Sequence, residues 1–148
     1  MNKLIATCFG IGYIQKGAGT IAALFCCLTW YLLKIDQANL FVQLFYLLIL
    51  FFAGVFTASK VENDWGHDSK RVVIDEWMGM GVALFMVPFS LTYFSIAFLL
   101  FRLFDIAKPF FIRRAETAPG GWGVMLDDLL AGIYSAVILQ LLIKSHLF

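Results

Sequence analysis

Two pairs of adjacent carboxylates are the residues of this chain best suited to chemistry. Asp75-Glu76 and Asp127-Asp128 each open an apolar segment, and Asp68 lies seven residues before Asp75. A helix start needs only one capping acceptor, and neighbouring carboxylates repel each other unless a cation lies between them. Adjacent helical residues diverge by about 100°, so within each pair one acid can face a shared site while the other orients a neighbour. The pattern favours a hard divalent cation, which prefers oxygen ligands.

A third group combines positive and negative charge at a spacing of three. Arg102, Asp105 and Lys108 fall near one face of a helix, where the acid can pair with the cations and the cations can hold phosphate. The alternative is that Arg102 and Lys108 only reach lipid headgroups from a helix end. Asp105 borders an apolar run, where an ionisable group is costly unless it is paired or functional.

Together these groups indicate phosphoryl chemistry on a lipid. Carboxylates hold a metal, Arg and Lys hold an anionic headgroup, and the glycines around Asp127 offer backbone N–H donors. His67 either binds phosphate or is a solvated loop residue. Cys8, Cys26 and Cys27 form no CxxC pair, which favours packing over zinc or disulfide chemistry.

The composition places these groups in a membrane protein. Hydrophobic residues make up 61% of the 148 residues, the mean hydropathy is +0.86, and soluble domains are about 45–50% apolar. The net charge of +1 and the lack of a basic run argue against a nucleic-acid partner. We therefore expect an all-α, polytopic membrane helix bundle that forms one domain over residues 1–148.

About four to five spanning or partly embedded helices must position the site. Residues 1–18 are short and glycine-rich, which predicts an interfacial or re-entrant segment, and residues 60–76 are polar enough for an aqueous loop. The expected spans are 19–34, 38–59, 76–88, 92–105 and 128–145.

This arrangement gathers most basic residues, and every acid except Asp36, on one side of the membrane. Only Lys34 and Lys144 fall on the other side, so the excess of Lys and Arg marks the shared side as cytoplasmic. The segments beside Pro88 are short for full spans, and a partly embedded hairpin there is the alternative.

Four motifs, in this order along the chain, resemble those of the phosphatidylglycerophosphatase A family. They are Gly17-Ala18-Gly19-Thr20, Asp68 through Ile74-Asp75-Glu76 with Gly79, Phe101-Arg102 through Asp105-Ile106-Ala107-Lys108-Pro109, and Gly120-Gly121-Trp122-Gly123-Val124-Met125-Leu126-Asp127-Asp128 with Ala131-Gly132. The resemblance implies a multi-pass, Mg²⁺-dependent phosphatase of the bacterial inner membrane. Its active site would face the cytoplasm and remove the terminal phosphate of the phospholipid phosphatidylglycerophosphate, giving phosphatidylglycerol.

The resemblance also implies roles for individual residues. The catalytic set would be Asp68, Asp75, Glu76, Asp105, Asp127 and Asp128. Of these, Asp75, Glu76, Asp127 and Asp128 would be the metal ligands. The substrate-binding set would be Thr20, Arg102, Lys108 and Gly121.

Alternatives remain at the level of mechanism and function. The chain has neither a Cys-x5-Arg loop nor an Asp-x-Asp-x-Thr/Val motif, so direct attack by water is our hypothesis, with a covalent aspartyl-phosphate as the alternative. Other functions are a different lipid-headgroup phosphatase, a headgroup transferase or a small transport subunit. The chain lacks the long Asp-Gly…Ala-Arg signature of headgroup transferases, which argues against a transferase. Its acids gather at one surface instead of mid-span, which argues against a transport subunit. The sequence indicates no required protein partner and leaves the oligomeric state open.

Overall fold

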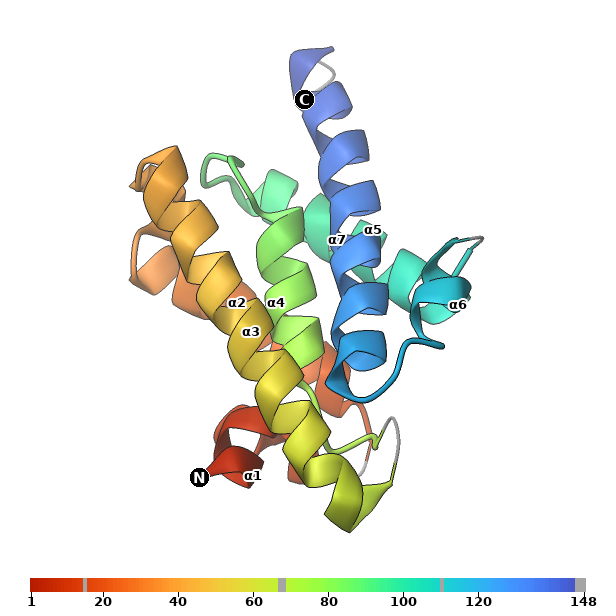
Figure 1. Ribbon diagram of the computed structural model, residues 1–148. Coiled ribbons are helices and arrows are strands. Elements are labelled where there is room, and N and C mark those ends of the chain that lie inside the picture. The colour runs from red at the N-terminus through yellow and green to blue at the C-terminus, as the bar shows by residue number, and fades with distance from the viewer. Residues whose placement is uncertain (15, 67–68, 110, 146–148) are drawn as a thin grey trace.

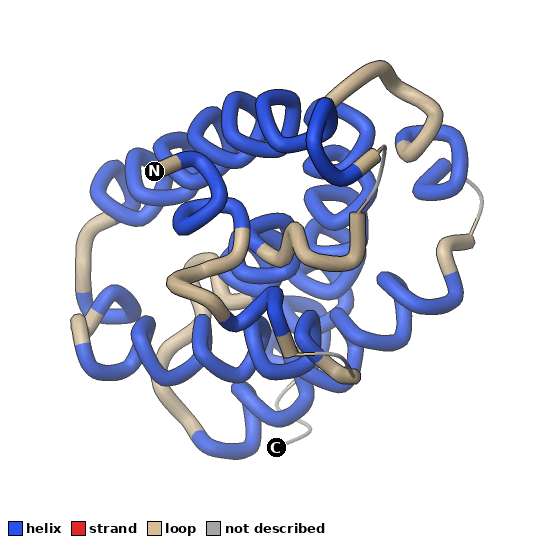
Figure 2. Tube along the Cα trace, turned by 90° about the horizontal axis from the view of Figure 1, so that it is seen from below, coloured by secondary structure: helices blue, strands red, loops and turns tan. Residues whose placement is uncertain are grey.

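The computed structural model describes residues 1–14, 16–66, 69–109 and 111–145, and their regular structure is entirely helical (Figures 1 and 2). The helices are α1 (Asn2–Ala6), α2 (Ala18–Leu32), α3 (Leu40–Trp65), α4 (Ile74–Ala83), α5 (Leu91–Ala107), α6 (Phe111–Ala115) and α7 (Gly121–Lys144). Short 3-10 turns cover Ile11–Tyr13 and Ile35–Gln37. The all-α prediction is confirmed for this part of the chain.

Helix α4 is the centre of the bundle, because it packs against α2, α3, α5 and α7. Its closest neighbour is α7, and glycines permit that approach. A Cβ added at Gly79 would lie 2.6 Å from the backbone oxygen of Asp128, and one added at Gly132 would collide with the backbone oxygen of Gly79. Small residues at such crossings let helix backbones meet, as is common between membrane helices.

The direction of these helices brings distant segments to one end of the molecule. In Figure 1, α4 and α7 both rise from the lower end, whereas α3 descends toward it. The N-terminal turns of α4 and α7 therefore lie side by side although about fifty residues separate them, and the acids at residues 75–76 and 127–128 come together there.

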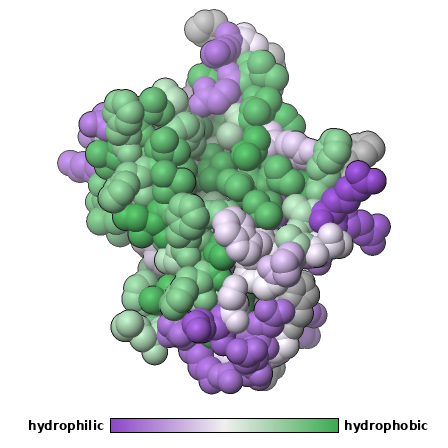
Figure 3. Space-filling model, in the orientation of Figure 1, coloured by the Kyte–Doolittle hydropathy of each residue, from purple (hydrophilic) through white to green (hydrophobic). Residues whose placement is uncertain are grey.

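Two helices are long and apolar enough to cross a membrane. These are α3, with 26 residues, and α7, with 24. Helices α2 and α5 are shorter, and the ten residues of α4 rise only about 15 Å, half of a hydrocarbon core. Apolar side chains dominate the middle of the face in Figure 3, while hydrophilic ones gather at its lower end and over α6, with smaller hydrophilic areas at the top of α7 and at the left edge. Membrane association follows, and a count of four to five spans stays a prediction.

Several predicted boundaries need correction. Helix α7 begins at Gly121, not at residue 128, so the glycine-rich stretch is helical and its two acids lie in the second turn. Helix α3 continues to Trp65, because the polar residues after Lys60 extend the helix beyond its apolar part instead of forming a loop. The predicted break around Pro88 is confirmed, since α4 ends at Ala83 and α5 begins at Leu91.

The N-terminal segment supports the start of α4. Helix α1 packs against α3, where Lys3 pairs with Asp64 at 2.7 Å. The backbone N–H of Val73 donates to the carbonyl of Ala6 at 2.9 Å, and the Cys8 thiol donates to the carbonyl of Val73 at 3.4 Å. This segment therefore fixes the residue that precedes α4. Its interfacial or re-entrant placement stays a prediction.

Candidate active site

A polar cavity of about 300 Å³ lies where α2, α4, α5 and α7 converge. Most of the residues proposed from the sequence line it: Asp75, Glu76, Arg102, Asp105, Lys108, Asp127 and Asp128. Both acidic pairs and the cationic group thus share one cavity, as their spacing suggested. The parallel course of α4 and α7 and the last turns of α5 bring them together.

Three carboxylates form a compact oxygen cluster in this cavity. One oxygen each from Asp75, Glu76 and Asp128 lies within 4.8 Å of the others. Asp75 and Glu76 come from the first turn of α4, and Asp128 comes from the second turn of α7. The cluster contains three of the four proposed metal ligands, whereas Asp127 faces a different partner.

The cluster has the features that a hard cation requires. Asp75 Oδ1, Glu76 Oε2 and Asp128 Oδ2 are buried, and none has a hydrogen-bond partner within the described chain. Burial, reinforced at Asp75 by its acidic neighbours, raises the pKa of Asp75 well above its usual value and that of Glu76 to about 7. Buried carboxylate oxygens without partners are costly, and an all-oxygen set of this size suits Mg²⁺. The residues present therefore fit the proposed metal.

The first turn of α2 shapes the cluster from the other side. Helix α2 begins after Gly17, whose φ of 77° is left-handed, and Gly17, Ala18 and Gly19 line the cavity. A Cβ added at Gly19 would collide with Glu76 Oε1 and lie 2.7 Å from Glu76 Cδ. Glycine is therefore needed at this position for the Glu76 side chain to lie against α2.

A cationic wall faces the acids. The Lys108 ammonium lies 2.8 Å from Asp127 Oδ2 and 3.1 Å from Glu116 Oε1. Burial alone would lower the pKa of Lys108, but the two carboxylates raise it well above its usual value, so Lys108 stays charged. On α5, Arg102 forms an ion pair with Asp105. Both pairs hold positive charge beside the oxygen cluster.

The remaining proposed residues lie elsewhere. Asp68, like His67, falls outside the described residues. Thr20 and Gly121 are not among the described residues that line the cavity. The Gly121 N–H donates to Ser59 Oγ at 2.8 Å, and a Cβ there would collide with α3. Gly121 therefore lets α7 pack against α3.

The sequence reasoning missed several residues in the cavity or in contact with its lining. Gly17 and Gly19 line the cavity, whereas the sequence reasoning expected Thr20 with the backbone nearby and did not name these glycines. Lys70 lines the cavity, and its position next to Arg71 in a charged segment was the available signal. Glu116 pairs with Lys108 because the chain folds back through α6, which no sequence spacing indicates.

Comparisons with known proteins place the chain in a family. The model of the family described as phosphatidylglycerophosphatase A matches residues 4–143. A Bacteroides thetaiotaomicron protein named putative phosphatidylinositol-3-phosphatase is 41% identical, covering 92% of this chain and 89% of the relative. Proteins named phosphatidylglycerophosphatase A from Haemophilus influenzae and Escherichia coli are 35% and 34% identical, covering 91% and 92% of this chain and 84% and 80% of their own lengths. No solved structure matched. The chain belongs to the phosphatidylglycerophosphatase A family.

Proposed function

We propose that this protein hydrolyses the terminal phosphate of phosphatidylglycerophosphate to give phosphatidylglycerol, with Mg²⁺ as its cofactor. One observation carries the proposal. Three carboxylate oxygens without hydrogen-bond partners in the described chain share a cavity with Arg102 and Lys108. This combination suits a phosphate monoester whose oxygens bind a divalent cation and basic side chains at the same time.

Asp75, Glu76 and Asp128 would hold the metal. When bound there, Mg²⁺ would supply positive charge that neutralises the phosphate oxygens and promotes ionisation of a water molecule. The three side chains would hold the cation in one place, because they extend from two helices locked together at Gly79 and Gly132. Asp68 remains a proposed catalytic residue.

The cationic wall would bind and orient the phosphate. Arg102 presents a planar guanidinium that can hold two phosphate oxygens, and Asp105 fixes its orientation. Lys108 contributes charge instead of a proton, since its two carboxylate partners keep its pKa high. The N–H groups in the first turn of α2, beside Gly19, add donors at the positive end of a helix.

Two routes fit this arrangement. In direct hydrolysis, a water oxygen forms the new bond to phosphorus as the bond to the glycerol oxygen breaks. In the alternative route a carboxylate attacks first, and water then cleaves the aspartyl-phosphate. The stereochemistry at phosphorus separates them, because each displacement inverts the configuration. With a terminal phosphate made chiral by sulfur and oxygen isotopes, we expect inversion from the single displacement by water, and net retention would exclude direct attack.

The proposed location is the bacterial inner membrane, with the cavity on the cytoplasmic face. The apolar lengths of α3 and α7 support crossing, and the predicted excess of basic residues on the cavity side supports the orientation. Cysteine-labelling of Lys70→Cys in intact and opened cells tests it. Lys70 is exposed beside the cavity, so we expect a membrane-impermeant reagent to react only after opening. Reaction in intact cells would reverse the orientation.

A second substrate is favoured by one specific comparison. The Bacteroides relative is named as a phosphatidylinositol-3-phosphatase, and both substrates carry a phosphate monoester on a lipid headgroup. Purified protein in mixed micelles with Mg²⁺ should be assayed for phosphate release from phosphatidylglycerophosphate, phosphatidylinositol 3-phosphate and phosphatidic acid. Asp128→Asn is the inactive control.

We expect the fastest release from phosphatidylglycerophosphate. Faster release from phosphatidylinositol 3-phosphate would assign the inositol lipid instead. Release from none of the three lipids would refute the phosphatase proposal and favour the transport alternative. Transfer of the headgroup to another alcohol, without phosphate release, would indicate the transferase.

A further inference from the structure

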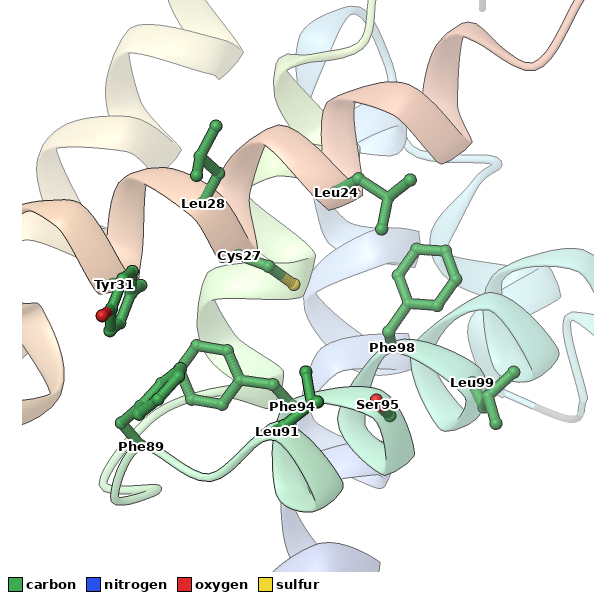
Figure 4. Close-up of a pocket in the computed structure, with 10 residues that line it drawn as sticks. All are labelled: Leu24, Cys27, Leu28, Tyr31, Phe89, Leu91, Phe94, Ser95, Phe98 and Leu99. Atoms are coloured by element: carbon green, nitrogen blue, oxygen red, sulfur yellow. The ribbon is translucent and has the colours of Figure 1, made fainter.

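A second cavity, of about 460 Å³, forms an apolar groove between α2 and α5 (Figure 4). Helix α2 contributes Leu24, Leu28 and Tyr31, and α5 contributes Phe94 and Phe98. In Figure 4, Tyr31, Phe94 and Phe98 lie in the space between the two helices. Leu24 and Leu28 remain about half exposed, at 50% and 51%, so the groove is open along one side.

The groove continues the polar cavity along the same two helices. Figure 4 shows that α2 and α5 run in opposite directions, with Tyr31 near Phe89 at one end and Leu24 near Phe98 at the other. Phe98 is one helical turn before Arg102, which lines the polar cavity. The first turn of α2 lines that cavity too. The Leu24 end of the groove therefore lies next to the proposed phosphate site.

The length of the groove matches the length of one lipid acyl chain. Leu91 at the far end is eleven residues before Arg102 on α5, a rise of about 16 Å. A bilayer hydrocarbon core is about 30 Å thick, so each leaflet holds chains about 15 Å deep. A lipid with its phosphate beside Arg102 could extend one chain along the whole groove.

We propose that this groove binds one acyl chain of the lipid substrate. The proposal rests on the proposed function, because it takes the phosphate in the polar cavity as the anchor of the same molecule. A chain seated between α2 and α5 fixes the depth of the headgroup relative to the carboxylate cluster. The groove thereby makes turnover depend on chain length, and not only on the headgroup.

Filling the groove tests this inference. Ser95 lines the groove from α5 and is exposed, so Ser95→Trp adds bulk there without entering the core. Thr92→Trp is the matched control, because Thr92 is also exposed on α5 but does not line the groove. Each variant is assayed on long-chain phosphatidylglycerophosphate and on its deacylated, water-soluble headgroup.

We expect Ser95→Trp to lower kcat/KM for the long-chain lipid at least about tenfold, which corresponds to the loss of contact between the groove and about two methylene groups of the chain. Its activity on the deacylated headgroup should stay unchanged, and Thr92→Trp should leave both activities unchanged. Equal losses on both substrates, or no loss on either, would overturn the proposal.

A readout without turnover separates this inference from the proposed function. The inactive Asp128→Asn protein is irradiated with phosphatidylglycerophosphate that carries a photoreactive acyl chain, and the labelled peptides are identified. We expect label in residues 24–31 and 91–99, and less of it in Ser95→Trp. Label in other residues would overturn the proposal that the groove binds the acyl chain. Equal labelling of these residues by phosphatidylcholine with the same photoreactive chain would overturn it too. If the groove residues are labelled as expected but no lipid releases phosphate, the phosphatase proposal is refuted and the groove proposal is not.

Discussion

Adding one methyl group at Gly19 should inactivate the proposed site without weakening the fold. A Cβ there would lie 2.7 Å from Glu76 Cδ, and ordinary contact begins at 3.4 Å, so the carboxyl carbon must move by at least 0.7 Å and its Oε1 atom by more. Mg²⁺ accepts ligands only near 2.0–2.1 Å, and a displacement of about 1 Å can cost roughly a hundredfold in rate. We expect a loss of about that size in Gly19→Ala.

The fold should tolerate the change, because alanine favours a helix over glycine by about 1 kcal/mol and the colliding atoms end a flexible side chain. Phosphate release measured over a range of Mg²⁺ concentrations, together with thermal unfolding, checks both expectations. Glu76→Asp provides the matched test, since its shorter side chain withdraws from Gly19. The loss caused by Gly19→Ala should be smaller in that background. Full activity of Gly19→Ala, or strictly additive losses in the double variant, would refute the reasoning.

Three further predictions follow from the same cavity. Asp128→Asn should weaken Mg²⁺ binding at least about tenfold, whereas Asp127→Asn should mainly disturb Lys108. Calorimetric titration with Mg²⁺ measures the affinity of each variant, and equal losses of affinity would contradict the assignment. Lys108→Ala should raise KM roughly tenfold or more by removing a charged contact to phosphate, while Glu116→Gln should raise it less. Steady-state kinetics measures both values, and an unchanged KM in Lys108→Ala would contradict the assignment. The pKa of Glu76 is raised to about 7, so the folded protein binds more protons than the unfolded chain between about pH 4.5 and 7, and without Mg²⁺ its stability should fall as pH rises through this range. Mg²⁺ should reduce this fall, which thermal unfolding at pH 5 and 8 would show. An equal fall in stability with and without Mg²⁺ would contradict a cation at Glu76.

The grouping of the charged residues could be predicted because it depends on residue types at close spacing. The two acidic pairs and the Arg102–Lys108 group do share one cavity, and charge asymmetry had already placed them on one side. The break near Pro88 was readable too, since proline ends a helix by removing a backbone donor. Local features of this kind can be predicted from the residue types and their spacing.

Tertiary packing decided what the sequence could not show. The glycines before Asp127 suggested a loop, but Gly121 and Gly123 are helical because each removes a side chain that would collide with neighbouring backbone. Glycine in a sequence signals either backbone freedom or close approach, and only the neighbours distinguish the two. The same ambiguity hid the role of Gly19, whose contact, Glu76, lies 57 residues away.

The two acidic pairs also differ in a way that helix geometry alone does not explain. On α7 the expected division holds, because Asp128 joins the oxygen cluster and Asp127 turns to Lys108. On α4 both members join, although adjacent helical residues point about 100° apart. Glu76 differs from an aspartate by one methylene, and that extra reach is usable only because Gly19 leaves room against α2. The third carboxylate of the cluster therefore depends on a glycine in another helix, and the longer side chain of Glu is what brings it there.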